Sequence, residues 1–357
     1  MKRNAYTAIS LFSGAGGLDL GFRKAGFKVV WANDFNKAAC ETYRTNFGEE
    51  MHEGSIMDYD YDALPECDLV FGGPPCQGFS VAGKMDPDDP RSKLVFEFQK
   101  VVAAKRPYCF VMENVAALGR LEKFATVRQK LLDEYARLGY AVRFEVLDSQ
   151  HYGTAQRRER MIMIGVRDAV EAIRFPKPAG RCITARDVLR GFDAPGTGNN
   201  RGACEARISC AKAPVLRASP YAGMLFNGMG RPIDLDRPCQ TLPASMGGNK
   251  TPFFDTRLLK DPKADDWLAD LHAKALKGAD ISHVEVPSFI RRITVSEAAA
   301  LQGFPPDFMF CGSRCDQYRQ IGNSVPPPFA RHIAAAVMKM FMSRDAVATS
   351  RGKNFRG

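Results

Sequence analysis

YTAISLFSGAGGLDLGF, residues 6–22, decides the fold, because it joins a buried strand to a helix through a glycine-rich turn. The apolar run at 6–12 predicts the strand, and GLDLGFRKAG after it predicts the helix. FKVVWAND then predicts a second strand at 27–34, which ends on an acid. A strand, a glycine turn and a helix in this order predict a backbone that approaches a ligand closely.

Strands and helices continue to alternate through the first half of the chain. This pattern predicts an α/β fold with a doubly wound sheet, and places ligands at the carboxyl ends of the strands. The expected helices lie near 36–47, 93–104 and 121–138, and the expected strands are CDLVFG at 67–72, YCFVMEN at 108–114, AVRFEVLD at 141–148 and RMIMIGV at 160–166.

The character of the sequence changes after Phe175, where Pro- and Gly-rich stretches replace the regular alternation. Residues 177–290 are therefore predicted to form a smaller, loop-rich domain with a basic surface. Two helices are expected later, in VSEAAALQGF and HIAAAVMKMF, and the polar tail from Ser343 is expected to fray. The predicted organisation is a first domain at 1–176, a second at 177–290, a hinge and return segment at 291–319, and a segment at 320–357 that completes the first domain.

Composition narrows the class of protein. The chain has 357 residues, 45% of them hydrophobic, and a formal net charge of +10, which favours a polyanionic partner. No apolar run is long enough for a membrane span and no signal peptide is recognisable, so a cytosolic location is expected. Ten scattered cysteines are expected to be free thiols. Cys311 and Cys315 have near-metal spacing but no second pair, so no metal site is expected.

The glycine turn favours one kind of ligand. A dinucleotide fingerprint needs a third glycine where this chain has Asp19, which disfavours a nicotinamide cofactor. Asp34 ends the second strand, where a carboxylate can accept both hydroxyls of a ribose, and Phe35 can pack on an adenine ring. These residues suit an adenosyl ligand without a pyrophosphate, although a plain turn between strand and helix is the alternative.

The segment GGPPCQGFS at 72–80 places Cys76 on a rigid proline turn directly after a strand. An exposed thiol at the carboxyl edge of the sheet suits a nucleophile, and the polar loop that follows could close over DNA. A buried structural cysteine is the alternative. Glu113 ends another strand at the same edge, where a protonated carboxyl could donate to a ring nitrogen. In QRRER, Arg158 and Arg160 alternate along an extended segment, so both can point into one pocket.

Taken together, these motifs resemble those of the cytosine-5 DNA methyltransferase family, in the family's order. The resemblance runs from about Thr7 to Val337, apart from 177–290, and PPCQ, ENV and QRRER are its most specific part. The matching segments are FSGAGGLDLGF from residue 12, PPCQGFS from 74, ENV from 113, QRRER from 156, RRITVSEAAALQGFP from 291 and QIGNSVPPPFA from 320. The resemblance implies a Rossmann-like, doubly wound mixed sheet of the S-adenosylmethionine-dependent methyltransferase type, with a target-recognition domain at 177–290.

The resemblance also implies the reaction. A methyl group passes from S-adenosylmethionine to carbon 5 of a cytosine that is flipped out of a specific double-stranded DNA site, leaving S-adenosylhomocysteine, and no metal takes part. Cys76 resembles the nucleophile that adds to carbon 6. Glu113 resembles the group that holds N3 and the exocyclic amine. Arg160 resembles the group that binds O2, with Arg158 supporting it.

Further residues are implied at the cofactor and the DNA. Those at the cofactor are Phe12, Ser13, Gly14, Ala15, Gly16, Gly17, Leu18, Asp34, Phe35, Ser55, Ile56, Pro75, Asn323 and Ser324. Those at the DNA are Gln77 and Ser80 beside the flipped nucleotide, Thr241 and Leu242, and Gly247, Gly248, Asn249 and Lys250 in the loop SMGGNKT, which is expected in the major groove.

Two positions depart from the family's pattern. An acid often precedes the isoleucine of the third strand motif, and here Ser55 takes its place, which removes a carboxylate contact to the adenine. A small polar residue often follows the serine of the cysteine loop by two, and here it is Ala82. The side chain that fills the hole in the duplex is therefore expected to come from elsewhere.

Alternative functions follow from the same motifs. RNA cytosine-5 methyltransferases of the DNA-methyltransferase-like type share the cysteine turn, but usually carry a Cys-Phe-Thr element that this chain lacks. A non-catalytic DNA-binding protein would typically have lost the nucleophile or the glycines. The partners implied are double-stranded DNA and, as a candidate, a cognate restriction endonuclease, with the protein acting as a monomer in the bacterial cytosol.

Overall fold

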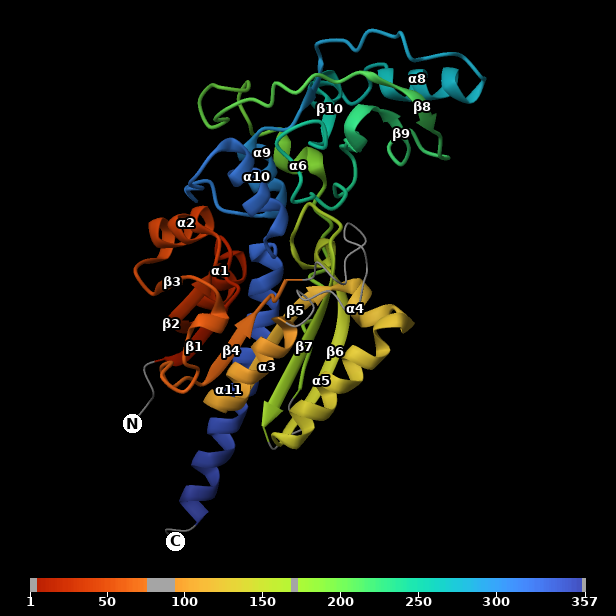
Figure 1. The fold of residues 1–357 in the computed structure, drawn as a ribbon. Coiled ribbons are helices and arrows are strands. Elements are labelled where there is room, and N and C mark those ends of the chain that lie inside the picture. The colour runs from red at the N-terminus through yellow and green to blue at the C-terminus, as the bar shows by residue number, and fades with distance from the viewer. Residues whose placement is uncertain (1–4, 76–93, 168–172, 355–357) are drawn as a thin grey trace. The chain divides into compact units, whose positions relative to one another are not determined.

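A computed structural model describes residues 5–75, 94–167 and 173–354 of the chain (Figure 1). The chain divides into two compact units. The first unit contains Met1–Tyr152, Glu159–Ala179 and Pro327–Gly357, and the second contains Gly153–Arg158 and Gly180–Pro326. Residues 153–158 and 291–326 thus belong to the same unit as most of the predicted second domain at 177–290. The functions assigned to the four predicted segments stay predictions.

The first unit is built on a sheet of seven strands in the order β3-β2-β1-β4-β5-β7-β6. The first five in this order are parallel, and β7 is antiparallel to both β5 and β6. The predicted doubly wound mixed sheet is therefore confirmed. The strands are β1 Tyr6–Leu11, β2 Phe27–Asp34, β3 Met51–Glu53, β4 Leu69–Gly72, β5 Cys109–Val115, β6 Tyr140–Asp148 and β7 Glu159–Arg167.

The direction of winding reverses between β1 and β4. From β1 the chain proceeds outward through β2 to β3, and it then returns to the other side of β1 with β4 and β5. Ligands of doubly wound sheets bind at such a switch point, at the carboxyl ends of the strands. The glycine turn after β1, the acid that ends β2 and the turn after β4 all lie at this edge.

Helices cover both faces of the sheet (Figure 1). Val70 packs in one core cluster with Phe98 of α3 and Tyr135 of α5, whereas its neighbour Phe71 stacks on Phe22 of α1 with ring centroids 4.2 Å apart. Successive side chains of a strand point to opposite faces, so α3 and α5 lie on one face and α1 on the other. The helices of this unit are α1 Gly17–Lys24, α2 Lys37–Phe47, α3 Leu94–Lys105, α4 Ala116–Arg120, α5 Ala125–Arg137 and α11 Pro327–Asn354.

Some elements differ from the sequence-based expectations. The helix expected at 121–138 begins later, at Ala125, because Leu121 is extended and Glu122–Phe124 form a 3-10 turn. The Arg128 guanidinium satisfies the carbonyls of Leu118 and Leu121 there. The short strand β3 was not expected. The last helix begins earlier, at Pro327, because a proline fits the first helical position, where its missing N–H is not needed. The tail expected to fray from Ser343 continues this helix to Asn354.

The second unit has short elements around two hydrophobic clusters. Its helices are α6 Ala185–Leu189, α7 Thr256–Lys260, α8 Trp267–Leu276, α9 Val295–Gln302 and α10 Arg314–Asn323, and its strands are β8 Cys210–Val215, β9 Met224–Phe226, β10 Phe253–Asp255 and β11 Ile290–Arg292. Few of its backbone groups lie in long ladders, so side chains must satisfy many of the others.

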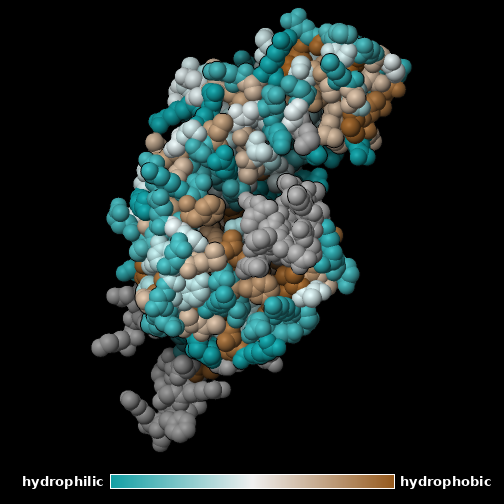
Figure 2. All heavy atoms as spheres, viewed as in Figure 1, coloured by the Kyte–Doolittle hydropathy of each residue, from teal (hydrophilic) through white to brown (hydrophobic). Residues whose placement is uncertain are grey.

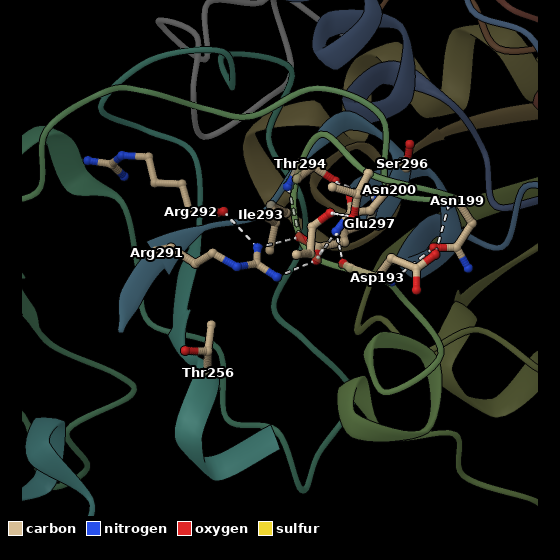
Figure 3. A network of polar contacts seen from close by, with 12 residues as sticks. Asp193, Asn199, Asn200, Thr256, Arg291, Arg292, Ile293, Thr294, Ser296 and Glu297 are labelled. Carbon is tan, nitrogen blue, oxygen red and sulfur yellow. Dashed lines mark hydrogen bonds and ion pairs between the residues drawn. The ribbon is translucent and has the colours of Figure 1, made fainter. Parts of the chain in front are cut away.

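A buried carboxylate organises the start of α9 in this unit (Figure 3). Glu297 is fully buried, and its two oxygens accept hydrogen bonds from Arg291 at 2.6 and 2.8 Å. It also accepts from the Thr294 backbone N–H at 2.9 Å, which forms a capping box, and from Asn200 Nδ2 at 3.0 Å. One acid thus fixes the N-terminus of α9, β11 and the loop at Asn200 together.

The surface of the second unit is less polar at one end. Figure 2 shows hydrophobic surface gathered where Figure 1 labels α8, β8 and β9. Exposed hydrophobic residues include Val215 at the end of β8, Leu276 at the end of α8 and Val284 in the loop that follows α8. Among the described residues, no helix combines the length and the apolar character that crossing a membrane requires.

We predict that Gly165→Ala destabilises the first unit. Gly165 of β7 lies opposite Phe110 of β5, and a Cβ at this position would overlap the Phe110 ring. That ring is itself fully buried and stacked on Tyr135, so it has no room to move. Overpacking of this kind costs about 1–3 kcal/mol of unfolding free energy, which urea denaturation measures. Gly191→Ala is the control, because a Cβ there meets only ordinary contacts, and equal stabilities of the two variants would contradict the prediction.

Candidate active site

The glycine turn between β1 and α1 is fixed in one shape. Gly14 and Gly16 have φ angles of 55° and 84°, in the left-handed region that favours glycine. Phe12 has a φ of 53°, which is uncommon for an aromatic residue, and such strain tends to cluster at functional sites. A Cβ on Gly16 would also overlap the ring of Phe47. The turn therefore presents backbone, and no bulky side chain, at the start of α1.

Asp34 ties this turn to the end of β2. Its Oδ2 accepts the Gly14 N–H at 2.8 Å, and its Oδ1 accepts the Asn36 N–H at 2.8 Å. The side chain is buried, and burial raises the pKa of the Asp34 carboxyl, while backbone N–H groups of Asn36, Gly14 and Phe35 act in the opposite sense. Each carboxylate oxygen can accept more than one hydrogen bond, so the contacts within the protein leave capacity for hydroxyl groups of a ligand.

An exposed aromatic ring lies next to this acid. The Phe35 side chain is 65% exposed, although it directly follows a buried strand. An exposed phenyl ring offers a flat apolar surface on which a planar base can pack. Ser55 and Ile56, also predicted at the cofactor, begin the short 3-10 helix Ile56–Asp58 (η1). The Ser55 hydroxyl caps this helix by accepting the Met57 N–H, and the Ile56 side chain is buried.

The second part of the edge carries an ion pair. Glu113 of β5 and Arg160 of β7 meet with an Oε1–Nε distance of 2.8 Å, and the two side chains are 11% and 14% exposed. Because β7 runs antiparallel to β5, the first residues of β7 lie beside the last residues of β5, and Val115 pairs with Arg160. The antiparallel strand thus delivers a guanidinium to the carboxyl edge of a parallel strand.

The backbone after β4 passes close to the Glu113 carboxyl. A Cβ on Gly73 would lie 2.8 Å from Glu113 Oε2, so a larger residue would displace this carboxylate. Asn114 is buried, and its Nδ2 donates to the Pro74 carbonyl at 3.1 Å. Glu113 and Asn114 therefore hold the entry of the proline turn, and Pro75, predicted near the cofactor, follows it. Cys76, Gln77, Ser80 and Ala82 lie outside the described residues.

The structure gives the two arginines of QRRER different partners. Arg160 pairs with Glu113, as described above, whereas Arg158 is only 3% exposed and binds backbone carbonyls of the second unit. Its guanidinium donates to the Leu242 carbonyl at 3.3 Å and to the Gly322 carbonyl at 2.7 Å. The role predicted for Arg158, support of Arg160 at the base, stays a prediction.

The residues predicted at the DNA fall into a buried and an exposed group. Leu242 is buried, whereas Thr241 is exposed and its hydroxyl donates to the Arg157 carbonyl at 2.7 Å. In the following loop the side chains of Asn249 and Lys250 are exposed, and a Cβ on Gly248 would meet nothing within 4 Å.

This loop is closed by a hydrogen bond between residues four positions apart. The Gly247 N–H donates to the Thr251 hydroxyl at 2.9 Å, and Gly247 has a φ of 108°. The loop is therefore held by a bond between its own residues, and it presents the polar side chains of Asn249 and Lys250 outward.

The predicted C-terminal cofactor residues lie at the end of α10. Asn323 is exposed, whereas Ser324 is buried and its hydroxyl donates to the Gln320 carbonyl at 2.7 Å. Among the described residues, no three His, Cys, Asp or Glu side chains gather as metal ligands would, and Cys311 and Cys315 are free thiols.

Two polar residues at the sheet edge were missed by the sequence analysis. Asn33 is buried, and its Nδ2 donates to the carbonyls of His52 and Gly54, which anchors the segment after β3. Asn114 anchors Pro74 in the same way. An asparagine inside an otherwise apolar strand is the signal that could have identified Asn33, and Asn114 also lies in the ENV motif, although its contact with Pro74 was not predicted.

Asp19, which occupies the place of the third glycine, is fully buried in the first turn of α1. Its Oδ1 accepts the Tyr43 hydroxyl at 2.9 Å, and the guanidinium of Arg23 donates to that hydroxyl and to Glu50. Burial raises the pKa of the Asp19 carboxyl to about 6, against the opposing effect of its hydrogen bonds and of Arg23. This network braces α1 against α2 directly behind the glycine turn.

Comparison with known proteins adds sequence evidence. The sequence profile of the family described as C-5 cytosine-specific DNA methylase matches residues 6–339. The type II methyltransferase M1.HphI of Haemophilus parahaemolyticus is 35% identical over 349 residues, which cover 94% of this chain and 87% of that protein. M.NgoPII of Neisseria gonorrhoeae, also a type II methyltransferase, is 34% identical and covers 94% of this chain and 96% of its own.

Solved structures share the fold. A putative DNA modification methyltransferase encoded within an E. coli prophage superposes with a TM-score of 0.67 at 22% identity, over 94% of this chain and 99% of its own. A Spodoptera frugiperda DNMT2 mutant gives a TM-score of 0.65 at 17% identity, over 95% and 100% of the two chains. At these identities the likeness concerns the fold alone.

We predict that Asp19 makes the stability of the protein depend on pH. Its pKa is raised on folding from 3.8 to about 6, so the folded state binds a proton more tightly than the unfolded state. The stabilising effect of that proton is complete below pH 3.8 and is lost as the pH rises through 6. As the pH falls from 7.5 to 5, the parent should therefore gain about 1–2 kcal/mol of unfolding free energy. Asp19→Asn cannot titrate at this position and should not share this gain.

Urea denaturation of parent and variant across this pH range measures the effect. Asp270→Asn, which removes an exposed carboxylate on α8, is the control for a change in surface charge. A difference between Asp19→Asn and parent that is the same at both ends of the range would overturn the prediction.

Proposed function

The chain belongs to the C-5 cytosine-specific DNA methylase family, and we propose that it methylates a cytosine flipped out of a specific double-stranded DNA site. The predicted family and the predicted activity of a DNA cytosine-5 methyltransferase are both confirmed by the match over residues 6–339 and by relatives at 34–35% identity. The observation that carries the proposal is the carboxyl edge of the sheet, where the Glu113–Arg160 pair meets the proline turn that leads to Cys76.

The relatives named above are type II methyltransferases. We infer that this chain is likewise the modification enzyme of a restriction-modification system, with a cognate restriction endonuclease as its functional partner. A substrate of genomic DNA places the enzyme with the nucleoid in the bacterial cytosol. The net charge of +10 supports a polyanionic partner of this kind.

The glycine turn fits S-adenosylmethionine as the cofactor. Backbone N–H groups at the start of α1, the Asp34 carboxylate and the exposed Phe35 ring suit an adenosyl group that carries no pyrophosphate. The turn residues Phe12 to Leu18 and Pro75 are proposed to contact the cofactor, and Asn323 and Ser324 are proposed to contact its methionine part. When bound, this cofactor supplies an electrophilic methyl group on a sulfonium sulfur.

Carbon 5 of cytosine is a poor nucleophile, so the protein must activate it. The Cys76 thiolate adds to carbon 6, and the electron pair of the ring double bond moves toward carbon 5, which can then take the methyl group. Glu113, which is paired with Arg160 as a carboxylate in the absence of a base, takes up a proton from solvent and donates it to N3 where charge builds on the ring, and Arg160 holds O2. A base then removes the carbon 5 proton, and the bond between carbon 6 and sulfur breaks as the double bond re-forms.

The Glu113–Arg160 ion pair has a defined place in this scheme. It holds the carboxyl and the guanidinium side by side at the sheet edge, so both groups are in position before a base arrives. A preorganised pair avoids the cost of ordering these side chains during the reaction. Arg158 acts one step behind, because its contacts fix the chain that leads into β7.

Residues 177–290 are proposed to select the DNA site. The target carbon is inaccessible in a stacked duplex, so the base must be extruded at a cost of a few kcal/mol, which contacts to the surrounding DNA must offset. Asn249 and Lys250 are exposed on the loop after Leu242 and offer an amide and a cation to the DNA. Gln77 and Ser80 are proposed to contact phosphates beside the flipped nucleotide.

We predict that Asp34→Ala weakens binding of S-adenosylhomocysteine far more than it weakens binding of DNA. Loss of a charge-assisted contact to the ribose hydroxyls should cost about 1.5–3 kcal/mol, or roughly 10- to 100-fold in dissociation constant. Isothermal titration calorimetry measures the dissociation constant of S-adenosylhomocysteine. Asp58→Ala, which removes an exposed carboxylate from the same edge of the sheet, is the control. Unchanged affinity in Asp34→Ala would rule out the assignment.

We predict that duplex DNA with 5-fluorocytosine at the target position becomes covalently attached to Cys76 when S-adenosylmethionine is present. Thiolate addition at carbon 6 and methyl transfer should both proceed, because neither breaks the carbon–fluorine bond. Release then requires the carbon 5 substituent to leave as a cation, which a proton can do and fluorine cannot. The adduct should survive denaturing electrophoresis and map by mass spectrometry to the peptide that contains Cys76.

Variants distinguish the nucleophile from other thiols. Cys76→Ala should give no adduct and no methylation but should keep specific DNA binding, since that binding depends on phosphate and base contacts. Cys67→Ala, which removes a different free thiol of the first unit, should be trapped like the parent. Turnover on cytosine without any trapped adduct would count against the covalent mechanism, and an adduct on another cysteine would show that the nucleophile is not Cys76.

A further inference from the structure

Two buried glutamines join separate motifs within the second unit. Gln156 begins the QRRER segment and Gln302 ends α9, and neither side chain is exposed. Their amides are hydrogen-bonded to each other, with Gln156 Nε2 donating to Gln302 Oε1. Residues 146 positions apart in the sequence are thus directly linked by side chains that no catalytic step uses.

The hydrogen bonds of this pair extend to two further segments. Gln302 Nε2 donates to the Ile321 carbonyl at 3.0 Å and to the Ser324 carbonyl at 2.6 Å, which uses both of its hydrogens. Gln302 can therefore serve Gln156 only as an acceptor, and this fixes the orientation of the Gln156 amide. Gln156 Oε1 then accepts the Leu242 N–H at 3.1 Å. We call this series, from the Leu242 N–H through Gln156 and Gln302 to the carbonyls of Ile321 and Ser324, the glutamine link.

The same two backbone segments are also in direct contact. A Cβ on Gly322 would lie 2.5 Å from the Pro243 carbonyl oxygen and 2.6 Å from Ala244 Cα, so only glycine allows this approach. Arg158 bridges the contact, since it donates to the carbonyls of Leu242 and Gly322. Residues 242–244 and 321–324 therefore form one rigid joint, closed by the glutamine link on one side and by Arg158 on the other.

This joint connects three segments to which separate functions are proposed. Residues 242–244 lead directly into the loop proposed to read DNA, which presents Asn249 and Lys250. Residues 321–324 end with Asn323 and Ser324, which are proposed to contact the cofactor. Gln156 and Arg158 belong to the segment that continues into Arg160. Three proposed functions, DNA reading, cofactor binding and base holding, thus share one set of buried hydrogen bonds.

We propose that Gln302 is a positioning residue that couples DNA recognition to cofactor binding through the glutamine link. A shift of the recognition loop on DNA cannot be absorbed at residues 242–244 without breaking buried hydrogen bonds, and leaving buried polar groups unsatisfied is costly. The shift is therefore passed to residues 321–324, and ordering of one segment orders the other. This inference rests on the proposed function, because it takes from it the ligands of the two segments.

The test is the effect of DNA on cofactor affinity. The probe pair is S-adenosylhomocysteine and the duplex with the methylated site, which bisulfite sequencing identifies in DNA from cells expressing the protein. Isothermal titration calorimetry should show that the parent binds S-adenosylhomocysteine about five-fold or more tightly when the duplex is present. Gln302→Met, which keeps the size of the side chain and loses its hydrogen bonds, should bring this ratio down toward one.

Further variants separate coupling from stability. Gln156→Met breaks the same link from its other side, so it should lower the ratio equally, and the double variant should lose no more than either single variant. Gln317→Met, which removes an amide of α10 that donates to the Gly312 carbonyl and takes no part in the glutamine link, should keep the ratio of the parent. Leu271→Ala should also keep it, because it destabilises the second unit through a cavity away from the link.

Each outcome decides the proposal. A parent whose cofactor affinity is unaffected by the duplex, or glutamine variants that retain the parental ratio, would overturn it. If Gln302→Met does not fold, Gln156→Met decides by the same measurement. Failure of the proposed function would appear separately, as a parent that methylates no cytosine in any DNA, whereas the binding ratio is measured without turnover.

Discussion

The shape of the glycine turn depends on the Asp34 carboxylate, which accepts one backbone N–H from the turn and one from Asn36, the N-cap of α2. The glycine turn has left-handed backbone at Gly14 and a strained φ at Phe12, and such a shape does not persist unless its surroundings enforce it. Asp34 enforces it from the neighbouring strand, and the parallel register of β1 and β2 brings the two strand ends to the same level. A carboxylate that is already oriented by two backbone groups can meet ribose hydroxyls without first being ordered.

The reactive half of the site depends on the one strand pairing that breaks the parallel pattern. In a fully parallel sheet the residues at the start of a strand lie at the edge opposite to the site. Because β7 is antiparallel to β5, Arg160 at its start reaches Glu113 at the end of β5. Only glycine fits at position 73, because a Cβ there would lie too close to the Glu113 carboxyl. Asn114 donates to the Pro74 carbonyl next to it. The mixed sheet therefore brings a carboxyl, a guanidinium and the entry of the proline turn to one edge, which is the arrangement that the proposed chemistry needs.

The sequence predicted the sheet more fully than it predicted the site. Strands β1, β2, β5, β6 and β7 lie within two residues of their predicted positions, because buried runs bounded by glycines and charges give a strong signal. The pairing of Glu113 with Arg160 was not predicted, since the antiparallel direction of β7 cannot be read from apolar periodicity. Asn33, Asn114 and Gln302 were missed for another reason. Their partners are backbone carbonyls from distant segments, and a lone amide in an apolar stretch carries no indication of which carbonyl it meets. Arg158, expected beside Arg160, is bonded to carbonyls of Leu242 and Gly322 for the same reason.

The second unit shows how a loop-rich segment can be rigid without long ladders. Its backbone groups still have to be satisfied when buried, and charged or amide side chains replace the missing strands. Arg292 is 2% exposed and donates to the carbonyls of Ala206, Arg207 and Thr251, so one guanidinium closes three segments. Glu297 accepts hydrogen bonds from Arg291 and from the Thr294 N–H, and so joins their segments. Gln302 donates to the carbonyls of Ile321 and Ser324 and accepts from Gln156. Each of these buried side chains therefore bonds backbone groups, and Glu297 and Gln302 also bond the side chains of Arg291, Asn200 and Gln156. Exposed side chains of the same unit, including Asn249 and Lys250, are not part of this framework, so a substitution there leaves the buried hydrogen bonds in place.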